Sequence, residues 1–344
     1  MNFDPESTLM FREAAESSAV LAKQYKHNKQ VIADIANHLK NNPPKAVITC
    51  ARGSSDHAAT FAKYLIETRV GTLTSSAAPS ISSVYFAKQN LQNCLFLAIS
   101  QSGKSPDLLA TALAAKNAGA CVVAIVNVED SPLAIMADYC LPLCAGDEKS
   151  VAATKSYIAS LAAIIHLVAE WSDDSELKSA LEQTPKLLEQ AWHLDWSSAV
   201  TQLADAQHLF VMARGLGLGI ALESALKCKE TAGLHAEGFS SAEVLHGPQA
   251  LLGHDFPALI LAQNDETLSG VKIMAKDLVA RNVPVLIAGA TIQGAYELPT
   301  VTCHPVIEPI LLIQCVYKMI NALAVGRGMN PDQPAHLRKV TETV

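Results

Sequence analysis

The sequence predicts an α/β protein that contains two copies of one fold, each a mostly parallel sheet with helices on both faces. Near-continuous apolar runs alternate with segments of helical periodicity, as they do when helices connect buried parallel strands. Segments 51–53, 99–102 and 123–125 have similar counterparts 162 residues later, without a gap, which indicates a duplication. Half of the 344 residues are hydrophobic, which is enough for a core in each copy.

Each copy is expected to contain three alternating strands and helices. In the first copy, apolar runs predict strands at 46–50, 93–100 and 121–126, and helices at 54–68, 108–118 and 152–169. In the second copy, the strands are expected at 208–213, 258–262 and 283–288, and the helices at 219–231, 268–280 and 307–324. The predicted organisation is a helical segment (1–40), a first domain (41–171), a helical linker (172–198), a second domain (199–328) and a tail (329–344).

Composition and charge exclude several classes of protein. The net charge of −7 and the absence of a basic stripe argue against a nucleic-acid partner. The apolar stretches at 158–169 and 307–325 contain His166 and Lys318, so we expect core helices and no association with a membrane. The acidic start lacks a signal-peptide pattern, and the eight cysteines form no CxxC pair, which together predict a cytoplasmic protein with reduced thiols.

The segment 100–107 carries the strongest chemical signal, because it leaves a buried strand and enters a helix. Ser100, Gln101, Ser102 and Ser105 provide hydroxyl and amide groups at a helix N-terminus, a combination that favours phosphate binding. The loop at 52–55 follows the preceding strand, and ligands of open α/β sheets gather at the carboxyl ends of strands. We therefore expect both loops to face one pocket.

The second copy acts as an internal control for this prediction. It has Ala262 and Asn264 in place of the two serines at 100 and 102. A general need for helix capping would have kept hydroxyls in both copies. The asymmetry therefore predicts a phosphate site in the first copy.

The second copy carries a different set of residues. Glu223, Lys227 and Glu230 fall at helical spacing on an otherwise apolar helix, so we expect a buried charge cluster that could transfer a proton. His246 precedes Gly247-Pro248 and is expected in an accessible turn.

Three other motifs each lack a required residue, which rejects the first and the last and leaves the second a weak signal. A P-loop would need glycine at position 98, which is alanine, and a dinucleotide fingerprint would need glycine at position 220, which is isoleucine. The His-x-Glu pattern at 235–237 has no following PCxxC, so a zinc deaminase is excluded.

The ordered set of motifs resembles the sugar isomerase (SIS) domain family, in the tandem form found in the isomerase half of glutamine–fructose-6-phosphate aminotransferase. The resemblance covers essentially the whole chain and rests on segments 52–55, 100–103, 151–155, 223–230, 243–248 and 332–334. It implies two tandem SIS domains with flavodoxin-like, doubly wound sheets, and a homodimer with shared active sites.

The resemblance also implies roles for individual residues. Glu230 would move a proton between sugar carbons C1 and C2 with Lys227 beside it, His246 of a neighbouring subunit would assist ring opening, and Lys339 would reach the sugar carbonyl. The phosphate would be bound by Ser55, Ser100, Gln101, Ser102 and Ser105, and the sugar by Gly53, Ser54, Val151 and Ala153.

The implied activity is that of a glucosamine-6-phosphate deaminase with no metal or other cofactor. The family's aminotransferases release ammonia from glutamine with an N-terminal cysteine, and the first 49 residues of this chain contain none. Ala153 stands where the family usually has serine, which leaves the sugar open. The alternatives are a fructosamine-6-phosphate deglycase, a synthase that takes ammonia from elsewhere, and a phosphosugar sensor without catalysis. The joint presence of Glu230, His246 and Lys339 favours an enzyme.

Overall fold

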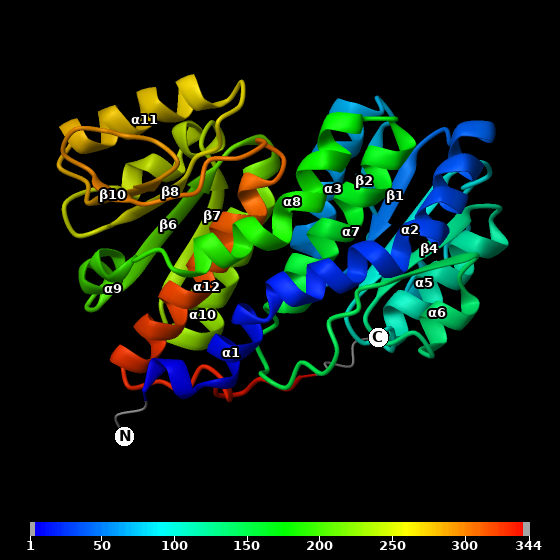
Figure 1. Ribbon diagram of the computed structural model, residues 1–344, viewed down its shortest axis with the longest axis horizontal. Helices are drawn as coiled ribbons and strands as arrows, with labels where there is room; N and C mark the ends of the chain where they lie inside the picture. The colour runs from blue at the N-terminus through cyan, green and yellow to red at the C-terminus, as the bar shows by residue number, and fades with distance from the viewer. Residues whose placement is uncertain (1–3, 340–344) are drawn as a thin grey trace. The chain divides into compact units, whose positions relative to one another are not determined.

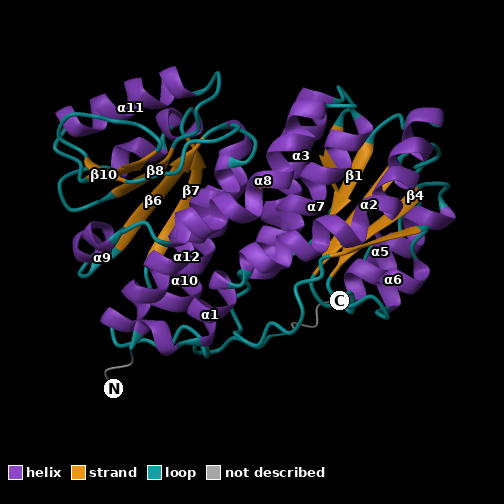
Figure 2. Cartoon of the chain, in the orientation of Figure 1, coloured by secondary structure: helices purple, strands orange, loops and turns teal. Residues whose placement is uncertain are grey.

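The computed structural model describes residues 4–339 and contains two five-stranded parallel sheets flanked by helices, which confirms the predicted fold class (Figures 1 and 2). The described residues form two compact units. The first-sheet unit comprises Ala19–Glu148, Lys155–Gln183 and the tail from Arg338. The second-sheet unit comprises the chain up to Ser18, Lys149–Thr154 and Thr184–Leu337.

The first sheet has the strand order β2-β1-β3-β4-β5, and all its strand pairs are parallel. Its strands are β1 (Val47–Cys50), β2 (Thr74–Ser76), β3 (Leu95–Ser100), β4 (Cys121–Val126) and β5 (Tyr139–Pro142). The associated helices are α3 (Ser54–Arg69), α4 (Ser80–Ser83), α5 (Pro106–Asn117), α6 (Pro132–Met136) and α7 (Lys155–Trp171). One face of the sheet packs its alternate apolar side chains against α5 and α6, while α3 and α7 pack against each other.

The second sheet has the order β10-β9-β8-β6-β7, which is the same topology when the strands are counted from β6. Its strands are β6 (His208–Ala213), β7 (His235–Ser240), β8 (Ala258–Leu261), β9 (Val285–Ala288) and β10 (Tyr296–Leu298). Its main helices are α9 (Ser197–Leu203), α10 (Leu218–Ala232), α11 (Leu268–Ala280) and α12 (Glu308–Gly326), with short 3-10 turns η2 (Gly215–Gly217), η3 (Glu243–His246) and η4 (Pro248–Leu251). The shared order supports the duplication that the repeated segments predict.

The flanking segments are helical where this was expected. The start of the chain forms η1 (Pro5–Ser7), α1 (Leu9–Ala15) and α2 (Ser17–Asn41), and the segment between the copies contains α8 (Ser175–Trp192), which continues through Pro185. Among the described residues, α12 alone is long and apolar enough to cross a membrane, but 78% of its most apolar stretch is buried. It therefore serves as a core helix of its own unit.

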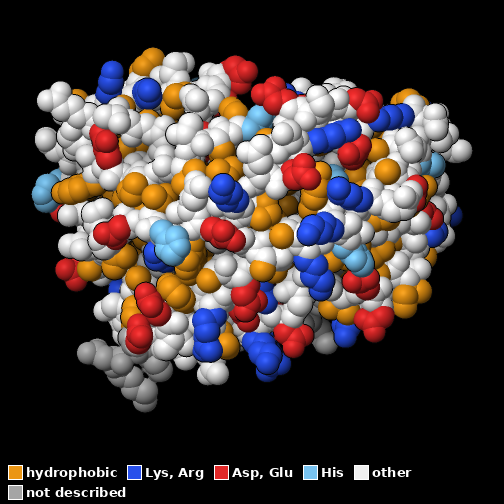
Figure 3. Space-filling view, in the orientation of Figure 1, with side chains coloured by type: hydrophobic (Ala, Val, Ile, Leu, Met, Phe, Trp, Pro, Cys, Tyr) orange, Lys and Arg blue, Asp and Glu red, His pale blue; other side chains and the backbone are white. Residues whose placement is uncertain are grey.

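The eight cysteines are all free, as expected from their spacing. On the face that Figure 3 displays, acidic and basic side chains are interspersed rather than gathered into a field of one sign. This distribution agrees with the modest negative net charge of the sequence.

Candidate active site

The predicted phosphate loop lies at the topological switch point of the first sheet. β1 and β3 are neighbours, with Cys50 opposite Ala98, while β2 lies on the other side of β1. The chain therefore leaves β1 and β3 toward opposite faces of the sheet, and the crevice between their carboxyl ends is where open α/β sheets bind ligands. Segments 51–53 and 101–105 follow these two strand ends directly.

The loop after β3 is shaped by its own serines and by one glycine. Ser100 Oγ accepts a hydrogen bond from the Gly103 N–H at 3.0 Å, and Ser102 Oγ accepts one from the Lys104 N–H at 3.4 Å. Ser105 precedes the first turn of α5, and its side chain makes no capping bond there. The loop thus brings backbone amides, hydroxyls and a helix N-terminus together, which are the donors that an anion site uses.

Gly103 is required by this geometry. Its φ of +63° lies in the left-handed region, and a Cβ at this position would lie 2.2 Å from Ser131 Oγ. We expect Gly103→Ala to weaken phosphosugar binding by about tenfold or more, because the strain and the clash together cost about 1–3 kcal/mol. KM for the phosphosugar measures the effect. Gly71→Ala is the control, since Gly71 has a φ of +78° but no atom within 4 Å of the added Cβ. Equal KM values for the parent and the Gly103 variant would contradict the assignment of this loop.

An ion pair joins the two loops of the crevice. Nε and Nη2 of Arg52 both donate to Oδ2 of Asp107, at 3.0 and 2.8 Å. The Asp107 side chain is buried, and the guanidinium neutralises a carboxylate that would otherwise repel phosphate at the start of α5. Arg52 therefore fixes the β1 loop against the phosphate loop, a role that the sequence analysis did not assign.

The predicted charge cluster of the second copy exists on α10. Lys227 Nζ lies 2.6 Å from Glu230 Oε2 and 3.3 Å from Glu223 Oε1. Tyr317 of α12 donates its hydroxyl to Glu223 Oε1 at 3.0 Å. The side chains of Glu223 and Lys227 are 0% and 1% exposed, whereas that of Glu230 is 22% exposed. Only Glu230 of this cluster can reach a substrate.

Lys227 remains an ammonium in this position. Burial alone lowers the pKa of Lys227, but the neighbouring carboxylates of Glu223 and Glu230 reverse the effect, and the net shift is upward. A charged, buried Lys227 cannot act as a base and has no open path to a sugar. Its geometry fits a positioning residue that holds the Glu230 carboxylate rather than a group that contacts the reacting atoms.

The remaining predicted catalytic residues lie in separate places. His246 ends η3 and is exposed, as its position before Gly247-Pro248 predicted. Lys339 belongs to the first-sheet unit with the phosphate loop, and its Nζ lies 3.2 Å from Glu148 Oε2. Glu148 is fully buried and also accepts hydrogen bonds from the backbone N–H and hydroxyl of Ser156. It therefore anchors the tail lysine.

The predicted sugar-contacting loop is held by two carboxylates, Glu13 and Asp332, for which the sequence predicted no role. Glu13 of α1 accepts from the backbone N–H groups of Lys149 and Ser150, at 2.5 and 3.2 Å. Asp332 accepts from two N–H groups at the start of α1, and its own carbonyl accepts from the Val151 N–H at 3.3 Å. The Asp-Gln-Pro segment of the tail thus ties α1 and Val151 together.

In the second sheet, a carboxylate occupies the position that corresponds to the predicted phosphate loop of the first sheet. Glu308, at the start of α12, accepts from the Asn264 N–H at 2.7 Å, directly after β8. Burial raises the pKa of Glu308, and the N–H groups of Asn264 and Cys303 oppose that shift. Glu308 also lines a cavity of about 620 Å³ at this edge of the sheet. A phosphate here would meet the carboxylate, which supports the prediction that the first copy alone binds phosphate.

The structure divides the predicted residues between the two units. Ser55, Ser100, Gln101, Ser102, Ser105, Gly53, Ser54 and Lys339 belong to the first-sheet unit, whereas Val151, Ala153, Lys227, Glu230 and His246 belong to the second-sheet unit. Each set is ordered within its own unit. That the two sets act on one sugar stays a prediction.

The chain is similar in sequence to known proteins over most of its length. The SIS domain matches residues 42–169 and 202–291 of the chain. Glutamine–fructose-6-phosphate aminotransferase (isomerizing) of Thermotoga maritima is 31% identical over 323 residues, which are 88% of this chain and 52% of that enzyme. The chain therefore spans about half the length of the curated relatives it matches.

Two solved structures extend the comparison. A crystal structure from Silicibacter pomeroyi, described as a candidate phosphosugar isomerase, is 38% identical with a TM-score of 0.91, covering 94% of this chain and 100% of that one. A glucosamine-6-phosphate deaminase from Thermotoga maritima has a TM-score of 0.79 at 20% identity, covering 98% of this chain and 100% of that one. The second likeness shows the fold alone.

Proposed function

The chain belongs to the SIS domain family, and from this premise we propose that it is an aldose–ketose isomerase of amino-sugar phosphates that works as a glucosamine-6-phosphate deaminase. One observation carries the proposal: a carboxylate, Glu230, is partly exposed while a buried ammonium holds it in place. A fixed carboxylate can remove a proton from one carbon and return it to the next, which is the step that an isomerase requires. The relatives' isomerase activity supports this assignment.

The proposed reaction begins with the anchoring of the sugar phosphate. Ser100, Ser102 and Ser105 with the adjacent backbone amides bind the phosphate, far from the reacting carbons, and supply positioning energy. His246, proposed to come from a second subunit of a homodimer, assists opening of the pyranose ring to the aldehyde. No metal or other cofactor is needed for either step.

The chemical steps then follow from Glu230. Its carboxylate removes the proton from C2 of the open aldehyde, and the electron pair forms a C1–C2 double bond as the carbonyl oxygen at C1 gains charge. Lys339 stabilises this charge. Return of the proton to C1 lets the nitrogen lone pair form a C2–N double bond, and a proton passes from nitrogen to the C1 oxygen, which gives the C2 ketimine. Water then adds to C2, and the C2–N bond breaks so that ammonia leaves and fructose 6-phosphate forms.

The test is the stoichiometry of the products. Purified protein with glucosamine 6-phosphate and no added metal is expected to release ammonia and fructose 6-phosphate in equal amounts. Turnover of a fructosamine 6-phosphate but not of glucosamine 6-phosphate would replace this proposal with a deglycase, for which Ala153 leaves room. Thermal stabilisation by glucosamine 6-phosphate without any turnover would replace it with a sensor. Activity in the amination direction alone would indicate a synthase.

A further inference from the structure

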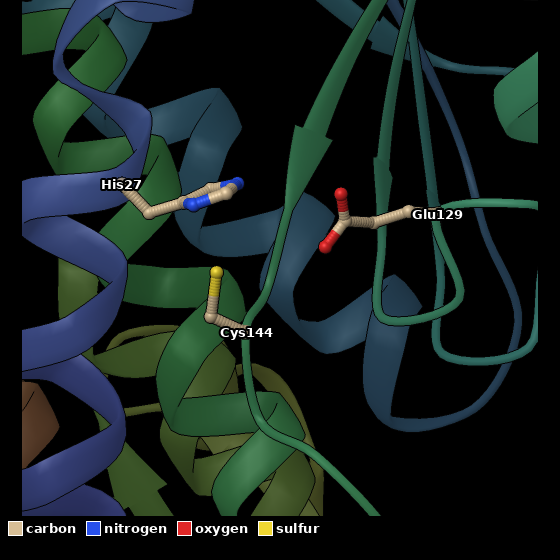
Figure 4. Close-up of side chains that lie close together, drawn as sticks. All are labelled: His27, Glu129 and Cys144. Atoms are coloured by element: carbon tan, nitrogen blue, oxygen red, sulfur yellow. The ribbon is translucent and has the colours of Figure 1, made fainter.

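Three potential metal ligands meet in the first-sheet unit, outside the residues proposed for the reaction. His27 lies on α2, Glu129 follows β4, and Cys144 follows β5. One ligand atom from each side chain lies within 4.8 Å of the other two. Figure 4 shows the imidazole, the thiol and the carboxylate pointing toward a common space between the helix and the two loops.

The segments that carry these side chains are fixed by buried hydrogen bonds around the cluster. Gln24 and Asn28, on either side of His27, donate to the carbonyls of Leu143 and Pro142 at 3.2 and 2.8 Å. Both amides are almost fully buried. α2 therefore cannot slide past the end of β5, and the imidazole of His27 stays opposite Cys144.

The two loops are fixed to each other in the same way. Asn127 accepts from the Ala145 N–H at 2.9 Å and donates to the Gly146 carbonyl at 2.8 Å. β4 and β5 are also adjacent strands, with Val126 opposite Pro142. Cys144 itself has a φ of +55°, a conformation that is uncommon for a residue other than glycine. The surrounding structure thus holds all three ligand-bearing segments in register.

We propose that His27, Glu129 and Cys144 form a binding site for a divalent transition-metal ion of the zinc class, with a water molecule as the fourth ligand. One imidazole, one thiolate and one carboxylate suit zinc or cobalt, whereas magnesium and calcium require oxygen ligands throughout. In a tetrahedral site the ligand atoms are about 3.3–3.8 Å apart. The exposed side chains of His27 and Glu129 can close the remaining ångström by rotation.

The duplication gives an internal comparison for this site. The position 162 residues after Glu129 is Thr291. The edge strands align at a shorter offset, because Ala124 lies opposite Cys140 and its counterpart Leu286 lies opposite Tyr296, so Cys144 corresponds to Thr300. Neither threonine carries a strong zinc ligand. The fold of the second sheet forms without these side chains, so the fold itself does not require them. The cluster is a feature of one copy, as the phosphate loop is.

The location suggests what the ion would do. The loop that carries Glu129 lies against the phosphate loop, because the Asn127 N–H donates to the Gln101 carbonyl and the Leu133 N–H donates to the Gly103 carbonyl, both at 3.2 Å. An ion bound to Glu129 would restrain this supporting loop. Its function is structural, and the proposed reaction does not pass through it.

Cobalt(II) is the probe, because a cobalt–thiolate bond gives a charge-transfer band in the near ultraviolet. Titration of the metal-free full chain is expected to reach one cobalt per chain and to produce this band. Cys144→Ser should abolish the band, and His27→Ala and Glu129→Gln should each weaken binding at least about tenfold. Zinc should raise the Tm of the parent protein but not that of Cys144→Ser.

Residues close to the three proposed ligands provide the controls. Cys140→Ser, Lys26→Ala and Asp130→Asn change a nearby thiol, a nearby α2 side chain and a nearby carboxylate, and should bind cobalt like the parent. The metal-free Cys144→Ser variant should have the Tm of the metal-free parent, which shows that the variant folds. A titration without the band, or a band that survives in Cys144→Ser or disappears in Cys140→Ser, would overturn the proposal.

Discussion

Glu230→Gln is expected to lower kcat for glucosamine 6-phosphate by about 10²–10⁴-fold, the contribution that a positioned general base usually makes. The substitution removes the basic carboxylate but keeps a side-chain oxygen that can still accept from Lys227, which lies 2.6 Å away in the parent. The ammonium also retains its second partner, Glu223. The fold and the phosphate loop should therefore be unaffected, and KM should change little.

Steady-state kinetics combined with a binding measurement separate these two effects. Glu237→Gln, an exposed carboxylate on β7, serves as the control and should keep the parent's kcat. A Glu230→Gln variant that retains more than about a tenth of the parent's kcat would show that another group moves the proton. If phosphosugar binding weakens as much as kcat falls, Glu230 would instead be shown to stabilise the bound substrate before the reaction.

The fold was predictable wherever a strand is buried on both faces. The six strands expected from apolar runs are the central strands β1, β3, β4, β6, β8 and β9, and all are present. The four strands that were missed, β2, β5, β7 and β10, are the four edges of the two sheets. β2 reads Thr-Ser-Ser and β7 reads His-Ala-Glu-Gly-Phe-Ser, which carry no continuous apolar run. Edge strands lack a neighbour on one side, so their sequences need not be apolar.

The candidate site was predictable where its parts are local in sequence. The phosphate loop and the α10 cluster each span eight consecutive residues. Their spacing along the sequence was therefore enough to predict that their side chains lie together. Contacts across long separations were not predictable in this way. Glu13 accepts a hydrogen bond from the backbone of Lys149, and Asp332 accepts one from the start of α1. The sequence around either acidic residue does not indicate which segment it binds. A buried carboxylate on a short helix, as Glu13 is, becomes informative only once the fold is known.

The site also shows how the duplicated fold can diverge in chemistry. Both sheets present backbone amides at the end of their third strand, but the first copy surrounds them with serines and the second fills the position with Glu308. In the second copy the protein's own carboxylate accepts from an amide after this strand, whereas in the first copy serines line the loop that is proposed to bind phosphate. The second copy instead provides the carboxylate that the proposed proton transfer needs, held on α10.

Lys227→Met is expected to destabilise the protein by about 3–5 kcal/mol, the usual effect of leaving a buried charge without its partner. The Glu223 side chain is 0% exposed, and without the ammonium it would retain the Tyr317 hydroxyl at 3.0 Å among its polar contacts but no counter-charge from Lys227. Lys229→Met, two residues along the same helix at an exposed position, should change the free energy of unfolding by less than about 0.5 kcal/mol. Urea unfolding at neutral pH measures both.

The double variant Glu223→Gln/Lys227→Met decides between a charge effect and a packing effect. Removing both buried charges should recover much of the stability, because the cost in the single variant comes from the loss of the Lys227 charge beside a buried carboxylate rather than from lost packing contacts. The pH dependence of the parent follows from the same pair. The pKa of Lys227 is raised in the folded state, so its stabilisation is fully present below lysine's ordinary pKa and is lost only as the pH rises through the raised value. A stability difference between the parent and Lys227→Met that already disappears near neutral pH would mean that Lys227 is not the ammonium that holds Glu230 in place.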